Sequence, residues 1–71
     1  MKLINKMQSV INNYHNIKCN IKILNNDVND IIICVPPESY ETIKPKEAKE
    51  VLNLAGYDVK FVGILNNLHN N

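Results

Sequence analysis

The first fourteen residues carry apolar side chains at the spacing of one face of an α-helix. The apolar positions follow one another at intervals of three or four residues, and Lys, Asn, Gln and Ser fill the opposite side. Asn13 and Asn16 suit the end of such a helix, because Asn tolerates a left-handed backbone. The pattern predicts a helix over about 2–14. Its apolar face consists of Leu3, Ile4, Met7, Val10, Ile11 and Tyr14.

From Ile17 the apolar period changes to two, which is typical of a strand with one buried face. The alternation lasts to Ile23, and the Asn- and Asp-rich stretch 25–30 has the composition of a turn. The run 31–35 is apolar throughout and predicts a second strand that is either central or covered on both faces. In a hairpin with Ile23 opposite Ile31, the residues Ile31 and Ile33 share one face with Ile21 and Ile23 of the first strand. A slip by one residue would place Ile31 and Ile33 beside Lys22 and Asn20.

Two prolines at 36–37 end this strand, because neither can donate to a ladder. Pro45 suits the first turn of a helix, where its missing N–H costs nothing. Apolar residues then recur at helical spacing, and Gly56 provides a C-terminal stop. We therefore expect a second helix over about 45–55.

After the second helix, apolar and polar residues alternate again. Tyr57, Val59 and Phe61 predict a third strand that fades at Gly63. The tail, 64–69, either adds one helical turn or frays.

The resulting order is α-β-β-α-β in a single small domain, 1–71. Its natural packing is an α+β two-layer sandwich, with a three-stranded sheet and two helices on one face. In this arrangement four apolar residues fall on the sheet face opposite the helices. They are Ile32, Cys34, Val62 and Ile64.

Composition removes several functional classes. The apolar share is 45% and the net charge is +1, so neither disorder nor a generally basic, nucleic-acid-binding surface is indicated. The chain has eight Lys and no Arg, so bidentate recognition of phosphate is not available. We find no signal-peptide core and no apolar run of the ~20 residues that a membrane helix needs. We expect a cytoplasmic protein that does not bind membranes.

The cysteines do not form a recognisable metal or redox motif. Cys19 and Cys34 are predicted opposite Val35 and Asn20, and so on different faces of the hairpin, which argues against a disulfide. A zinc site would need His15 or His69 as well, and the spacing is not one of the known ligand patterns. We expect both thiols to be apolar fillers, with no metal.

A catalytic cluster between the second strand and the second helix is also disfavoured. Cys34 has no histidine near it in sequence, and its apolar neighbours would raise its thiol pKa. Ser39 lacks the Gly-x-Ser-x-Gly turn of serine hydrolases. Glu38 and Glu41 fit a solvated loop that caps the following helix. The sequence also lacks a glycine-rich phosphate loop. We expect no catalytic residues and no cofactor.

Nucleic-acid binding stays open as an alternative. The element order resembles the circular order of a type II KH domain, which binds single-stranded RNA, but the Gly-x-x-Gly loop of that family is missing. Polar side chains could form a basic stripe on the outer sheet face, although without interleaved aromatic residues. The stripe would consist of Lys18, Asn20, Lys22 and Lys60.

Protein binding is the leading hypothesis. An apolar sheet face that includes Ile32, Cys34 and Val62 would need a partner, because soluble monomers seldom expose such a patch. A rigid aromatic in a proline-stiffened loop, Tyr40, is a natural anchor, flanked by the carboxylates of Glu38 and Glu41. The alternative for Tyr40 is that its ring folds back over the end of the second helix.

A resemblance to a known class of proteins suggests which kind of partner the chain would bind. The stretches MKLINKMQSVINNYHNIKCNIKIL and DIIICV are rich in Asn, Ile and Lys, and they open with an amphipathic helix followed by an Ile-rich hairpin. This resembles small phage and mobile-element accessory proteins, including anti-CRISPR inhibitors. The resemblance implies a non-enzymatic inhibitor that occupies the surface of a host nuclease or defence complex. It would act as a monomer or a small homodimer.

Overall fold

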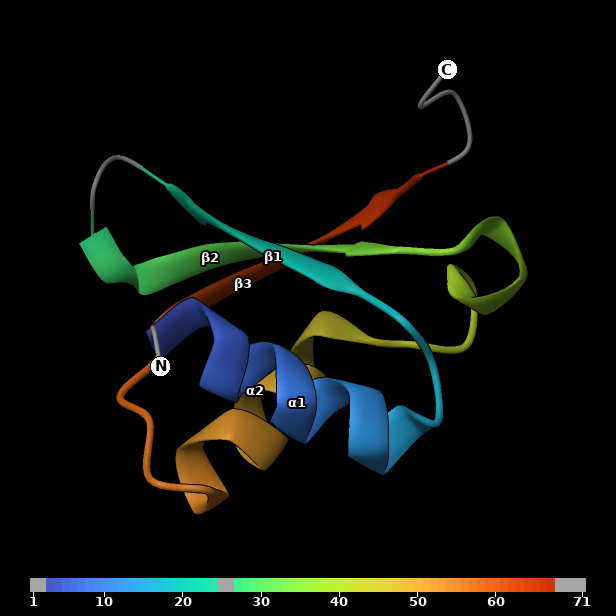
Figure 1. The fold of residues 1–71 in the computed structure, drawn as a ribbon. Coiled ribbons are helices and arrows are strands. Elements are labelled where there is room, and N and C mark those ends of the chain that lie inside the picture. The colour runs from blue at the N-terminus through green and yellow to red at the C-terminus, as the bar shows by residue number, and fades with distance from the viewer. Residues whose placement is uncertain (1–2, 25–26, 68–71) are drawn as a thin grey trace.

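The computed structural model describes residues 3–24 and 27–67 and has an α+β fold in two layers, as predicted (Figure 1). Three strands form one sheet, and both helices pack against the same face of it. In chain order the elements are α1 (Leu3–His15), β1 (Asn20–Leu24), β2 (Asp27–Val35), a 3-10 turn (Pro37–Ser39), α2 (Pro45–Leu54) and β3 (Phe61–Asn66). Neither helix of the described residues combines the length and apolar character needed to cross a bilayer.

Helix α1 forms where the apolar stripe predicts it. Met7 and Ile11 are buried at its centre. The helix ends at Asn16, whose φ of 56° is in the left-handed region that Asn tolerates. Ile17 N then donates to Asn12 O at 3.2 Å, which closes the last turn and directs the chain toward the sheet.

Strands β1 and β2 form the predicted antiparallel hairpin in the predicted register. Ile23 lies opposite Ile31, and Asn20 lies opposite Cys34. The prediction that 25–30 is all turn was wrong for 27–30, since β2 already begins at Asp27. The register shifts between Ile23 and Leu24. The polar start of β2 is held by the residue before β3, since Lys60 N donates to Asn29 O at 2.7 Å.

Helix α2 also follows the prediction. Pro45 occupies its first turn, and Ala48 and Leu52 are fully buried. Gly56 follows the last turn with a φ of 101°, a conformation that side chains with a Cβ rarely adopt. The chain then turns back under the sheet.

The third strand does not lie where the alternation of Tyr57, Val59 and Phe61 predicted it. Val59 N donates to Tyr57 O at 3.0 Å and also to Asn53 Oδ1 at 3.1 Å. These bonds hold Val59 outside the ladder, so β3 begins only at Phe61 and runs parallel to β2. Val59 and Val62 are both buried although they are three residues apart, which breaks the two-residue period.

This shift reverses the faces predicted for β3. Val62 pairs with Ile31 and Ile64 with Ile33, so both side chains belong to the helix-covered face and not to the outer one. The residues 64–66 are strand and not a helical turn. The rest of the predicted tail, 68–69, lies outside the described residues.

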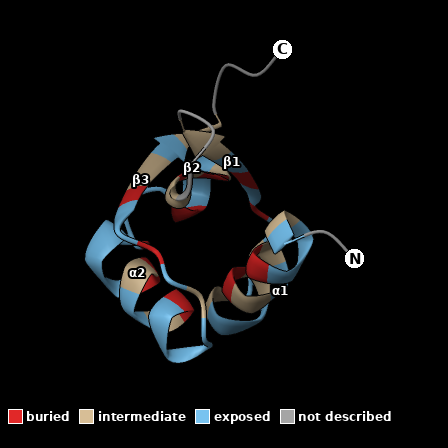
Figure 2. Cartoon of the chain, turned by 90° about the vertical axis from the view of Figure 1, so that its left-hand side faces the viewer, coloured by how far each residue is buried: buried red, intermediate tan, exposed pale blue. Residues whose placement is uncertain are grey.

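The core fills the space between the sheet and the helix pair (Figure 2). β2 is the central strand and supplies its middle, as predicted. The buried core residues are Met7, Ile11, Cys19, Ile21, Ile31, Ile33, Val35, Ile43, Ala48, Leu52, Val59 and Val62.

Candidate protein-interaction face

The sheet face that points away from both helices carries the most distinctive group of side chains in the described structure. The pairing of the strands defines this outer sheet face as Asn20, Lys22, Asp30, Ile32, Cys34, Phe61, Gly63 and Leu65. Phe61 and Leu65 are each 51% exposed, and Ile32 between them is half-buried. No helix of the described residues covers this face (Figure 1). Apolar area of this kind marks an interaction surface.

Ile32, Phe61 and Gly63 form a small packed unit on the outer sheet face. Ile32 lies opposite Gly63 in the register. A Cβ on Gly63 would come within 2.7 Å of Ile32 Cδ1 and 3.6 Å of the Phe61 ring. The Ile32 side chain therefore occupies the space that a side chain at 63 would need. The glycine lets two large apolar groups lie flat on the sheet.

Both cysteines are buried free thiols, as the sequence suggested. Cys34 is 5% exposed and lies between Asn20 and Leu65 on the outer sheet face. Cys19 belongs to the core, and burial raises its pKa to about 11, with the nearby Cys34 adding to the shift and a backbone hydrogen bond opposing it. A thiol with this pKa is protonated at neutral pH and is a poor nucleophile.

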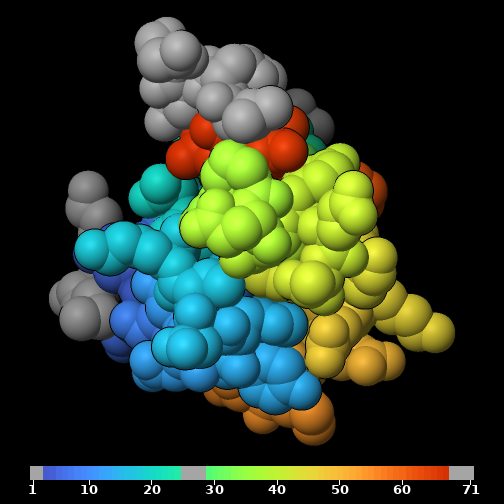
Figure 3. Space-filling view, turned by 90° about the vertical axis from the view of Figure 1, so that its right-hand side faces the viewer, coloured from blue at the N-terminus to red at the C-terminus, as the bar shows by residue number. Residues whose placement is uncertain are grey.

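The segment between β2 and α2 is a compact, self-bonded crossover. The carbonyl oxygen of Ser39 accepts hydrogen bonds from Thr42 N, Ile43 N and Thr42 Oγ1 at 3.0–3.1 Å. Ile43 is 3% exposed and anchors the crossover in the core. The crossover, 36–44, forms the yellow-green centre of the face shown in Figure 3. Ser39 thus organises a turn.

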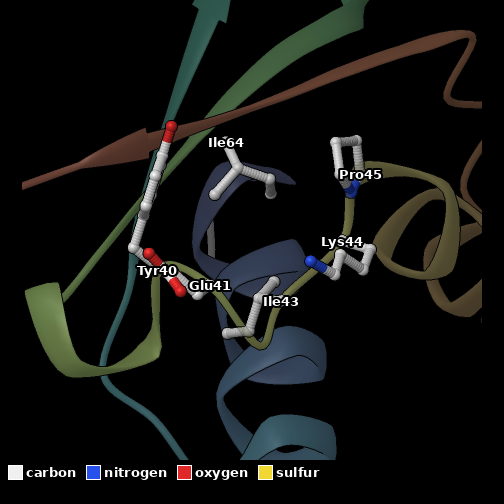
Figure 4. A pocket seen from close by; sticks show the side chains of 6 residues that line it. All are labelled: Tyr40, Glu41, Ile43, Lys44, Pro45 and Ile64. Atoms are coloured by element: carbon white, nitrogen blue, oxygen red, sulfur yellow. The ribbon is translucent and has the colours of Figure 1, made fainter.

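Tyr40 and Glu41 from this crossover face β3. They line a hollow of about 330 Å³ with Ile43, Lys44, Pro45 and Ile64. Figure 4 shows the Tyr40 ring standing upright with its hydroxyl toward β3, while Ile64 points down from the strand. Tyr40 is 41% exposed. Its ring thus lies near the start of α2 and still presents one face to solvent. Glu38 is exposed on the 3-10 turn and does not line this hollow.

The structure separates the residues predicted to bind a partner. Ile32 and Cys34 lie on the outer sheet face. Tyr40 and Glu41 lie at the β3 edge, next to the helix layer. Val62 is 7% exposed and belongs to the core. The sequence missed Phe61 and Leu65, because their faces depend on where β3 begins.

The lysine stripe is also divided. Asn20 and Lys22 lie on the outer sheet face, and Lys18 precedes β1. Lys60 directly precedes β3, at the other edge of the sheet, and lines a second hollow of about 270 Å³ together with Lys46 and Lys49. The four polar residues named by the sequence therefore do not form one stripe.

The free edge of β1 is occupied by two side chains of α1. Ile21 N donates to Gln8 Oε1 at 2.8 Å, and Cys19 N donates to Asn12 Oδ1 at 2.9 Å. The two amides are four residues apart and so lie on one side of the helix. Such bonds satisfy backbone donors that would otherwise be available to another strand. The sequence pattern assigned Gln8 and Asn12 to solvent.

Among the described residues, no group of three or more His, Cys, Asp or Glu side chains could hold a metal ion. His15 packs edge-on against Tyr14, with ring centroids 4.8 Å apart, and its Nε2 is buried without a hydrogen-bond partner. His69, the other histidine weighed as a zinc ligand, lies outside the described residues.

Comparison of the chain with protein-family models, with curated proteins and with solved structures found no match.

Proposed function

We propose that this protein is a non-enzymatic binding module that acts by covering the surface of another protein with its outer sheet face. The observation that carries the proposal is the half-exposure of Phe61 and Leu65 on a face that no described helix covers. Aromatic and aliphatic side chains of this kind are the usual anchors of protein interfaces. The residues Asn20, Lys22 and Asp30 around them would form a polar rim.

The packing of the outer sheet face supports a preformed binding surface. Ile32 is held over Gly63, so the apolar centre needs little reordering when a partner docks. A rigid surface loses less conformational entropy on binding than a mobile one. For the class of partner we carry the resemblance forward as part of the proposal: a host nuclease or defence complex is the first partner to test.

The proposal can be tested by capture with matched baits. The tagged wild-type protein, Leu65→Lys and Leu54→Lys are each incubated with host lysate, and bound proteins are quantified by mass spectrometry. Leu54 is 89% exposed at the end of α2, so its variant adds the same charge away from the outer sheet face. We expect a protein that is retained by wild type and Leu54→Lys and is reduced about tenfold or more by Leu65→Lys.

Light scattering of the purified protein completes this test. A homodimer that Leu65→Lys converts to monomer would also support the proposal, since a second copy is then the partner. A strict monomer that captures nothing, or captured proteins that all three baits retain equally, would contradict it.

Single-stranded nucleic acid is a second candidate, and one observation favours it. Phe61 lies on the same sheet face as Lys22, and an exposed aromatic is what a base-stacking sheet requires. Binding to labelled single strands at low and high salt tests this candidate, because phosphate contacts weaken as salt rises. The candidate fails if no binding is seen at low salt, or if Phe61→Ala leaves the affinity unchanged.

A further inference from the structure

The two edges of the sheet differ in how they are protected. At one edge, Gln8 accepts the N–H of Ile21 in β1, and Asn12 accepts the N–H of Cys19 just before the strand. At the other edge is β3, which pairs with β2 alone among the described residues. A strand with one unpaired side is the usual template for adding a further strand.

Two hollows follow the unpaired side of β3. The first, of about 330 Å³, lies between Ile64 and the crossover, and the second, of about 270 Å³, lies between Val62 and the start of α2. Both are lined by Pro45, so they adjoin each other there. We call the two together the β3 groove. In the first hollow, Tyr40, Ile43 and Ile64 provide an apolar wall (Figure 4).

The charge of the β3 groove is strongly one-sided. Four of the eight lysines of the chain line it, against one carboxylate, Glu41. The four are Lys44, Lys46, Lys49 and Lys60. None of them makes an ion pair within residues 3–24 and 27–67. The chain as a whole carries a net charge of only +1, so the cationic character is local to this edge.

We propose that β3 receives an extended, acidic segment of a partner protein as a fourth strand. This inference rests on the proposed function, because it requires a protein partner, but it uses the β3 edge, which shares only Phe61 with the outer sheet face. Backbone groups of the segment would pair with β3, while alternate side chains would enter the β3 groove. Carboxylates on the side of the segment that enters the β3 groove would meet its four lysines.

The charge argues for this occupant over a second copy of the chain. Two β3 edges placed side by side would bring two sets of unpaired lysines together, which is unfavourable. The length of the strand sets the size of the segment: β3 spans six residues, or about 20 Å at ~3.3 Å per residue. A peptide of six or seven residues is therefore sufficient.

The test is a titration of the labelled protein with a synthetic, end-capped heptapeptide, glutamate-valine-aspartate-valine-glutamate-valine-aspartate, followed by amide NMR. We expect shift changes along β3 and not along β1. Lys46→Glu combined with Lys49→Glu should weaken binding by at least about tenfold at 0.15 M salt. The matched control, Lys6→Glu with Lys18→Glu, makes the same charge change outside the β3 groove and should alter the affinity less than about twofold.

Two further peptides separate strand addition from simple charge attraction. Each carries N-methyl groups on alternate residues, in one frame or the other, which removes the N–H donors from one side of the strand. An added fourth strand loses binding in one frame and keeps it in the other. A peptide with lysine in place of every acidic residue should not bind.

The inference is overturned if the acidic peptide shifts no β3 amide, if both methylated frames bind alike, or if the peptide pairs with β1. It is also overturned if the peptide-free protein is a dimer joined through β3, or if a single-stranded oligonucleotide displaces the peptide equally well. Any of these results leaves the Leu65→Lys capture result standing, because Leu65 lies on the outer sheet face and not in the β3 groove.

Discussion

The side chain of Ile32 lies directly over Gly63 of the neighbouring strand, so that a Cβ at position 63 would sit 2.7 Å from Ile32 Cδ1. The terminal methyl of an isoleucine on the central strand therefore determines which residue the adjacent strand accepts. The Ile32 side chain also makes the centre of the outer sheet face a closely packed layer of β2 and β3 side chains.

This contact predicts a specific coupling between two substitutions. Gly63→Ala removes the flexibility of a glycine but places a Cβ against Ile32 Cδ1, whereas Ile32→Val removes that methyl. We expect Gly63→Ala to be less destabilising in the Ile32→Val background than in the wild type, by about 1 kcal/mol. Chemical denaturation of the four proteins of this cycle measures the coupling. Additive effects would show that the contact does not constrain position 63.

The side-chain amides of Gln8 and Asn12 accept backbone N–H groups at the β1 edge. Removing one of them should therefore speed hydrogen exchange at that edge. Asn12→Ala leaves the N–H of Cys19 without its acceptor, and we expect the free energy of unfolding to fall by about 1–2 kcal/mol. Hydrogen exchange should accelerate at the Cys19 amide before it does so in β2. Asn5→Ala, at an exposed position of the same helix, is the matched control and should change the stability by less than ~0.5 kcal/mol. Equal effects of the two variants would argue against a capping role.

The buried thiol of Cys19 predicts how stability changes at high pH. Its pKa rises from 9.0 to about 11 on folding, because burial disfavours the thiolate. Between these two values the unfolded chain has released a proton that the folded chain still holds, so the free energy of unfolding falls as the pH rises. The stability that the protonated Cys19 thiol contributes is fully present below pH 9 and is lost by about pH 11. Between these values the free energy of unfolding falls by at most ~1.4 kcal/mol per pH unit.

Urea denaturation between pH 8 and 11 measures this effect as a difference between the wild type and Cys19→Ala. The subtraction removes the titration of other groups that both proteins share. The wild type should lose more stability than the variant across this range. Parallel curves would mean that Cys19 titrates alike in the folded and the unfolded chain.

The parts of the fold that could be predicted depend on local patterns. The register of β1 against β2 followed from the sequence because a one-residue slip would place isoleucines beside Lys22. α2 followed from Pro45 and from the apolar positions before Gly56. In these cases each residue indicates its own face, and no distant contact decides the outcome.

The start of β3 could not be predicted from local periodicity. Tyr57, Val59 and Phe61 alternate as a strand should, but Val59 N bonds to Asn53 Oδ1 and not to β2, and bonding to β2 starts only where Lys60 N donates to Asn29 O. These partners are six and 31 residues away, so no local periodicity reveals them. The resulting shift by one position exchanges Val62 for Phe61 on the outer sheet face. The predicted binding face was therefore correct for β2 and wrong for β3.

The edge caps illustrate the same limit. Gln8 and Asn12 are polar residues on the side of α1 that the pattern assigned to solvent, and only the placement of β1 beside the helix gives them backbone donors to accept. A pair of amides at i and i+4, on a helix that leads into an edge strand, is the signal that could have found them.

The claim that the outer sheet face is the binding surface is tested most directly by methyl NMR of the complex with a soluble paramagnetic agent. The agent broadens exposed methyl groups, and in the free protein it should reach both Leu65 and Leu54, which are 51% and 89% exposed. When the captured partner is bound, or when a second copy is the partner, the account predicts that Leu65 becomes protected while Leu54 stays accessible. Protection of Leu54 with Leu65 still exposed would contradict it.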